Sequence, residues 1–225
     1  MTAIAPLHFA DPREAAGLAA FLRRLLHYDR AAAVRLQAGA GALAVFGRPS
    51  SFEVLAIRTA RLVDAVDLDV TVSAGELLEG IEESAGKAVV PDSVTGPPWA
   101  GVLPPRGGWE PVAGLPSADG IRGAVAAAVT EFRSRDEALP GERRTRAERD
   151  RIGREIWSRT LADTGLPLRA AHAAQSLGFL PRLPDEELPV VLFASGPWLR
   201  LRTPYGSVAL RTVPMALSVT PGTAR

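Results

Sequence analysis

The chain has 225 residues, of which 47% are hydrophobic and 23% charged, and its net charge is +1, a balance typical of a water-soluble globular protein. Because it has no cysteine, disulfides, thiolate nucleophiles and cysteine zinc sites are excluded. The near-neutral charge does not point to nucleic acid or to a membrane surface. The first residues lack a signal-peptide pattern, and no stretch reaches the roughly 18 apolar residues of a membrane span. We therefore expect a cytoplasmic protein that does not contact a membrane.

A capped helix followed by four strands is predicted for the first third of the chain. Asp11 and Glu14 have the spacing of a capping box, and Pro12 stands at the first helical position, where its missing N–H has no cost. Alternating apolar and polar residues then predict strands at 32–37, 42–47, 52–62 and 65–72. Ser73 and Glu76 form a second capping box, so a short helix is expected directly after the last of these strands.

The first two strands are separated by a glycine-rich turn that also resembles a nucleotide-binding motif. Gly39, Gly41 and Ala44 have the spacing of a dinucleotide fingerprint, but that motif needs a helix directly after it to bind the pyrophosphate. Only seven residues lie between Gly41 and Pro49, and they have a strand pattern. The interpretation that we favour is a plain hairpin turn.

Residues 86–116 form a long segment rich in proline and glycine, without helical or strand periodicity. A loop of this length inside a compact domain is usually functional or disordered, and its two tryptophans, Trp99 and Trp109, argue against disorder. Two interpretations stay open. Either Trp99, Arg106 and Trp109 form a recognition loop for a protein partner or a second copy, or the tryptophans fill a gap over a sheet. We expect Trp109 itself to be buried.

The last half of the chain predicts three helices and a second group of three strands. The helices are expected at 117–139, 142–163 and 167–177, and the strands at 188–194, 198–203 and 207–213. Helices and strands occur in blocks, so the predicted fold class is α+β, with two antiparallel meanders and about five helices. We expect one unit over 1–225; the alternative is an N-terminal half (1–86), the loop (87–116) and a C-terminal half (117–225).

The C-terminal order of helix, helix and basic hairpin is also that of a winged-helix DNA-binding domain. Acidic residues alternate with the arginines of the 142–163 helix, which favours a solvated face with internal ion pairs over a nucleic-acid surface. DNA binding is therefore an alternative, and not the first, interpretation. The residues that would contact DNA are Arg169, Gln175, Arg200, Arg202 and Arg211.

Enzymatic chemistry has weak support in the sequence. Asp67 and Asp69 point to the same face of one predicted strand, and His172 lies on a predicted helix; these are the only candidates for acid–base catalysis. The spacing of the three histidines does not match a metal site, and Ser195 has no nucleophile-elbow pattern around it. We therefore predict no catalytic residue, no metal and no cofactor.

The segments LPPRGGWEPV and GLPLRAAHAAQSLGFLPR are similar to segments of uncharacterised actinobacterial proteins. This resemblance implies a GC-rich bacterial source and no assigned function, and it brings no site residues with it. From the residues themselves we expect a non-catalytic regulatory or scaffolding module that acts through protein contacts, with the central loop as its contact region.

Overall fold

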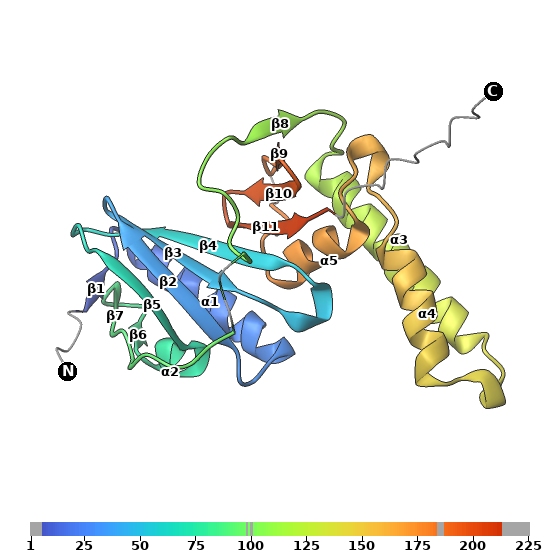
Figure 1. Ribbon diagram of the computed structural model, residues 1–225, viewed down its shortest axis with the longest axis horizontal. Coiled ribbons are helices and arrows are strands. Elements are labelled where there is room, and N and C mark those ends of the chain that lie inside the picture. Colours follow the sequence, from blue (N-terminus) through green and yellow to red (C-terminus); the bar gives the residue numbers. More distant parts are fainter. Residues whose placement is uncertain (1–5, 98, 100, 184–186, 213–225) are drawn as a thin grey trace, which may run out of the picture.

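The computed structural model describes residues 6–97, 99, 101–183 and 187–212 (Figure 1). The α-helices are α1 (Pro12–Tyr28), α2 (Ala74–Glu79), α3 (Ala118–Glu137), α4 (Arg146–Trp157) and α5 (Leu168–Ser176). The first strands are β1 (Leu7–His8), β2 (Ala33–Gly39), β3 (Ala42–Gly47), β4 (Leu55–Arg61), β5 (Leu68–Ser73), β6 (Ile81–Glu82) and β7 (Lys87–Ala88). The last strands are β8 (Glu110–Val112), β9 (Val191–Ser195), β10 (Trp198–Thr203) and β11 (Gly206–Arg211). The predicted α+β class is confirmed.

Both meanders belong to one antiparallel sheet of eight strands, in the order β5-β2-β3-β4-β11-β10-β9-β8. The two halves of the chain meet where β4 pairs with β11, through Leu55 opposite Ala209, Ala56 opposite Val208 and Ile57 opposite Ser207. A small second sheet, β1-β7-β6, lies next to the first half. The sheet is therefore continuous across the two halves, which the sequence left undecided.

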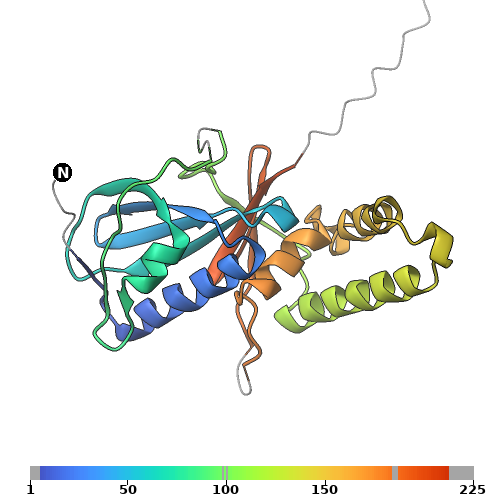
Figure 2. The same cartoon turned by 90° about the horizontal axis from the view of Figure 1, so that it is seen from below.

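The large sheet has helices on one face and the proline-rich segment on the other (Figure 2). The main core lies between the sheet and α1, α2 and α5, and it contains the inward residues of β2, β3, β10 and β11. A smaller apolar cluster lies on the opposite face, around Phe46, Leu55, Ile57, Trp99 and Ala209. Residues 55–58 of β4 are buried on both faces of the sheet. We call the face opposite the helices the open face.

α3 and α4 lie side by side and extend away from the sheet as a helical arm (Figures 1 and 2). Their charged side chains pair with one another, as the alternating acids predicted. The pairs include Arg135 with Glu131 and Glu155, Arg159 with the same two glutamates, and Asp136 with Arg144 and Arg149. No helix in the described part of the chain is long and apolar enough to cross a membrane.

The helix predicted at 142–163 is wrong at both ends. The side chain of Thr145 accepts a hydrogen bond from the Glu148 backbone N–H and caps α4, so the helix begins only at Arg146. It ends at Trp157, and a separate 3-10 turn follows at Ala162–Thr164. The helix caps predicted at Asp11 and Ser73 are confirmed by side-chain hydrogen bonds, and Ser117 caps α3 in the same way.

The C-terminus of α5 is a Schellman motif. Gly178 has a φ of +79°, the Phe179 N–H donates to the Ala174 carbonyl, and the Gly178 N–H donates to the Gln175 carbonyl. This ending turns Phe179 into the core, where its ring stacks on Phe21 with a centroid distance of 5.6 Å.

The buried Arg58 of β4 connects three elements on the helix side of the sheet. Its guanidinium donates to the Tyr205 carbonyl at 2.6 Å, in the turn between β10 and β11, and lies 3.5 Å from the Glu14 carboxylate of α1. Burial lowers the pKa of Arg58, and the nearby Glu14 charge opposes that shift. One buried cation thus ties the N-terminal helix and strand to the C-terminal hairpin.

We expect Arg58→Ala to lower the free energy of unfolding by about 2–4 kcal/mol, because it leaves a buried carbonyl and Glu14 without this donor. Arg61→Ala is the matched control, since Arg61 also lies near Glu14 but its side chain is 75% exposed; its loss should be below about 1 kcal/mol. Urea unfolding followed by tryptophan fluorescence measures both. Equal small losses would contradict the role of Arg58.

The turn between β2 and β3 is a hairpin turn and not a nucleotide loop, as predicted. Ala40 and Gly41 have φ values of +50° and +74°, the left-handed backbone that a type I′ turn needs at both positions.

Asn tolerates the left-handed backbone at position 40 better than Ala does. We expect Ala40→Asn to raise stability by about 0.5–1 kcal/mol, measured by thermal unfolding. Ala42→Asn, in the adjacent strand, should give no increase, and an unchanged or lower Tm for Ala40→Asn would contradict this account.

Candidate functional site

The proline-rich segment crosses the whole open face from one edge of the sheet to the other. At its start the Val94 N–H donates to the Thr71 carbonyl of β5, the first edge strand. At its end β8 pairs with β9 and forms the opposite edge. The seven interstrand gaps of this sheet span about 34 Å, and residues 94–110 could extend to about 55 Å, so the segment is long enough to cross. We call residues 94–109 the crossing segment.

Close contact with the sheet explains the composition of the crossing segment. A Cβ at Gly96 would lie 2.5 Å from the Thr71 methyl group, so only glycine allows this approach. Trp99 is 6% exposed and fills the apolar cluster over β3, β4 and β11. Further along, the Ser195 hydroxyl of β9 donates to the Gly107 carbonyl at 3.3 Å. Ser195 is thus a structural side chain, as expected from its sequence context.

Trp109 is only half-buried, so the prediction that it is a buried residue is wrong; Trp99 has that position instead. The indole Nε1 of Trp109 donates to the Pro105 carbonyl at 3.0 Å, which closes the loop on itself. The guanidinium carbon of Arg200 lies 5.9 Å from the Trp109 ring centroid, in a cation–π contact. Trp109 therefore lies at the surface, over the Arg200 guanidinium.

Arg200 lies on the open face because side chains alternate along β10. Trp198, Arg200 and Arg202 point to this face, while Leu199 and Leu201 point into the core against the helices. The Arg200 Nε donates to the Ser207 hydroxyl at 2.9 Å. Burial lowers the pKa of Arg200, and the neighbouring positive charge of Arg202 lowers it further.

Arg106 is exposed at the rim of a hollow of about 270 Å³ between the crossing segment and the sheet, with Gln37, Thr59 and Arg200 among its lining residues. Its positive charge reaches Asp69, whose pKa is lowered mainly by the hydrogen bond from Arg35 and slightly by Arg106. Three arginines, Arg106, Arg200 and Arg202, therefore gather on one side of the crossing segment, and Trp109 lies among them. We call these four residues the basic face.

The residues predicted to contact DNA are not on one surface. Arg200, Arg202 and Arg211 lie on the open face, whereas Arg169 and Gln175 belong to α5, which packs against the opposite face. Arg169 is half-buried, with its Nε 3.7 Å from Glu53. The sheet separates the two groups, so they cannot bind one DNA duplex in the winged-helix manner.

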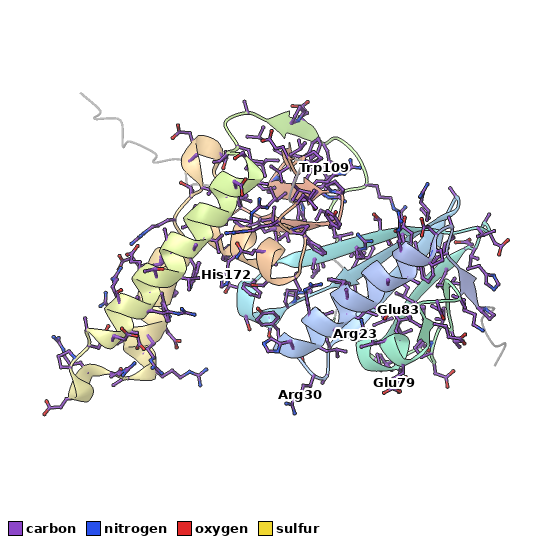
Figure 3. The ribbon with its side chains drawn as sticks, turned by 180° about the vertical axis from the view of Figure 1, so that it is seen from behind. Arg23, Arg30, Glu79, Glu83, Trp109 and His172 are labelled. Carbon is purple, nitrogen blue, oxygen red and sulfur yellow. The ribbon has the colours of Figure 1, made fainter. Side chains whose placement is uncertain are left out.

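The three residues considered for catalysis are also apart. Asp67 is exposed and precedes β5. Asp69 accepts two hydrogen bonds from Arg35, at 2.7 and 2.9 Å, and one from Gln37, so its carboxylate is already paired. His172 lies on α5, away from Trp109 and from the open face (Figure 3). Among the described residues, no group of three His, Asp or Glu side chains could hold a metal ion.

His172 belongs to a packed aromatic cluster. Its ring stacks on Trp157 with a centroid distance of 4.5 Å and contacts the edge of Phe52 at 5.1 Å. Burial lowers its pKa below the ordinary value of 6.5. These contacts favour a structural role for this side chain.

Sequence reasoning missed Trp198, whose ring lies on the open face with the Arg211 guanidinium carbon 5.9 Å from its centroid. The pattern WLRLRT, with Trp198, Arg200 and Arg202 at alternate positions, is the signal that could have found it. It also missed Arg48, which lies in an irregular connection and has no distinguishing pattern around it.

Two family models match the chain, and the boundary between the two matches lies within the crossing segment. Residues 2–101 match a domain of unknown function, DUF8010, and residues 104–215 match a second domain of unknown function, DUF8185. Together the two matches cover most of the chain, and neither domain has an assigned function. The resemblance to uncharacterised proteins is thus confirmed, while the actinobacterial source stays a prediction. No curated protein matches the chain. Because β4 and β11 come from different matched segments, the open face is built by both of them.

We expect the imidazole of His172 to titrate below pH 6.5 in an NMR titration, because burial disfavours its charged form. Below that pH the unfolded chain binds a proton that the folded chain does not, so this residue makes stability rise with pH up to about 6.5. His172→Gln should remove that part of the pH dependence in urea unfolding at pH 5 and 7. An imidazole that titrates above 6.5 would contradict the buried position.

Proposed function

We propose that the chain is a non-catalytic contact module of the bacterial cytoplasm that binds an acidic segment of a partner protein through its basic face. The observation that carries this proposal is that the Arg200 guanidinium is partly buried and makes no ion pair with the described residues. The guanidinium lies beside Arg202, and Arg106 and Arg202 likewise make no ion pair within the described ranges. A carboxylate from a partner would neutralise this uncompensated charge.

Arg200 is also held in position for such a contact. The hydrogen bond to Ser207 and the Trp109 ring fix its side chain, so less conformational entropy is lost when a carboxylate binds. Arg106 and Arg202 are exposed and can contact neighbouring acidic residues of the same partner. A fixed central arginine with exposed arginines around it matches the arrangement of interface hot spots.

An acidic protein segment fits this face better than nucleic acid. One face of the Trp109 ring lies against Arg200, so a base could stack on that face only by displacing this cation. Single-stranded and duplex nucleic acids also need a longer row of free cations than three arginines supply. DNA binding is therefore kept as an outcome of the test.

The test is fluorescence polarisation with labelled poly-L-glutamate and labelled duplex DNA, each over a salt series. We expect poly-L-glutamate to bind the full chain, and Arg106→Glu/Arg202→Glu to weaken it at least tenfold, because two attractive charges become repulsive. The control is Arg133→Glu/Arg143→Glu, which makes the same change in net charge at exposed positions of the helical arm. It should bind as the unchanged chain does.

Four outcomes decide between the alternatives. Loss of poly-L-glutamate binding in the first variant alone supports the proposal. Equal loss in both variants contradicts it, since net charge and not the basic face would then be responsible. Tighter binding of duplex DNA, reduced by Arg106→Glu/Arg202→Glu, would replace the acidic partner with nucleic acid. A salt-sensitive dimer in sedimentation analysis would identify the partner as a second copy of the chain.

A further inference from the structure

A second site lies on the open face, on the other side of the crossing segment from the basic face. It is a cleft of about 660 Å³ between the start of the crossing segment, the connection from β3 to β4 and the end of β11. Its volume is in the range of small-molecule sites. We call it the junction cleft, and the residues that matter here are Arg48, Leu55, Val102, Trp198, Ala209 and Arg211.

The junction cleft exists only because the two matched segments share one sheet. Arg48 and Leu55 come from the first matched segment, and Trp198 and Arg211 come from the second. Val102 lies in the middle of the crossing segment, between the two matches. Leu55 and Ala209 are direct partners in the β4–β11 ladder. The cleft therefore lies over the joint between the halves, where ligand sites between structural units are common.

The charged residues of the cleft leave a positive charge available. Of its two acids, Asp29 accepts a hydrogen bond from the Ala31 N–H, and Glu53 lies near Arg169. Arg48 is exposed and makes no ion pair with the described residues. Arg211 is exposed and rests on the Trp198 ring without an acidic partner among them. Two arginines thus face the same cleft without an ion pair to a described residue.

The remaining surface of the cleft is suited to an apolar body. Leu55 and Ala209 are buried side chains of the sheet, and Val102 packs beside them from the crossing segment. The half-buried Trp198 adds a flat aromatic wall. A ligand that fills the cleft would meet apolar atoms on one side and guanidinium groups on another.

We propose that the junction cleft binds a small organic anion, namely a molecule with a carboxylate or phosphate group on a flat apolar body. Arg48 and Arg211 hold the anionic group, and Trp198, Leu55 and Val102 contact the apolar part. Arginine suits both anions, because its planar guanidinium can donate two parallel hydrogen bonds to either. The two anions share this chemistry, and the experiment distinguishes them.

The experiment uses the full chain labelled with ¹⁵N and follows the indole N–H signal of Trp198, assigned with Trp198→Phe. The probes are 2-naphthoate, 2-naphthyl phosphate and neutral 2-naphthamide. We expect one or both anions to shift this signal in a saturable way and the amide to bind at least tenfold more weakly. Arg48→Gln and Arg211→Gln should each weaken the anion at least tenfold, whereas Arg202→Gln, on the same face, should not.

Each result decides the proposal. If neither anion shifts Trp198, if the amide binds equally well, or if Arg48→Gln has no effect, the proposal is wrong. Arg48 is an exposed residue outside the core, so its variant should fold even if Arg211→Gln does not. The anion that binds more tightly shows whether the cleft prefers a carboxylate or a phosphate group. The Arg106→Glu/Arg202→Glu variant should bind 2-naphthoate as tightly as the unchanged chain does. A failure of the proposed function of the basic face can therefore be distinguished from a failure of the junction-cleft proposal.

Discussion

The ladder between β4 and β11 joins residues about 150 positions apart in the chain, and both candidate sites depend on it. It removes two open sheet edges, one from each half, which would otherwise be available for aggregation. It also places β3 and β4 of the first half next to β10 and β11 of the second half, on a common surface. The crossing segment, the basic face and the junction cleft are all built on that surface.

The crossing segment fits this surface because it does not add hydrogen-bonding groups that need a partner strand. Its prolines lack a backbone donor, its glycines allow close approach, and its ends are tied to the two edges of the sheet. Trp99 supplies the apolar contact that holds its middle on the sheet. The segment therefore acts as a fixed cover, and its sides form the walls of both hollows.

Much of the local structure could be predicted from the sequence, because caps, turns and alternation are local signals. Asp11 and Ser73 cap their helices as expected, and the turn at Gly41 has the backbone that its glycine indicated. The pairing of β4 with β11 could not be predicted, because no local pattern specifies which distant edge a strand joins. The start of the second predicted long helix was missed because the Thr145 cap stands inside a continuous charged stretch.

The candidate sites were only partly predictable for the same reason. The sequence singled out Arg106 and Trp109, and both lie on the basic face, but it could not show that Arg200 lies beneath Trp109. It also grouped Arg200 with Arg169 because the order of helix, helix and basic hairpin is that of a winged-helix domain, although a sheet lies between them. Which face a side chain occupies depends on packing across the whole molecule, and single-sequence patterns do not contain that information.

The basic face and the junction cleft both require a single cooperative sheet that includes both halves of the chain. Hydrogen–deuterium exchange of the full chain, measured over a series of low urea concentrations, tests this claim. The amides of β4 and β11 should exchange with the same opening free energy and the same urea dependence, since they open together in global unfolding. If the β11 amides exchange through a separate opening of lower energy while β4 stays protected, the halves are independent and the shared open face is wrong.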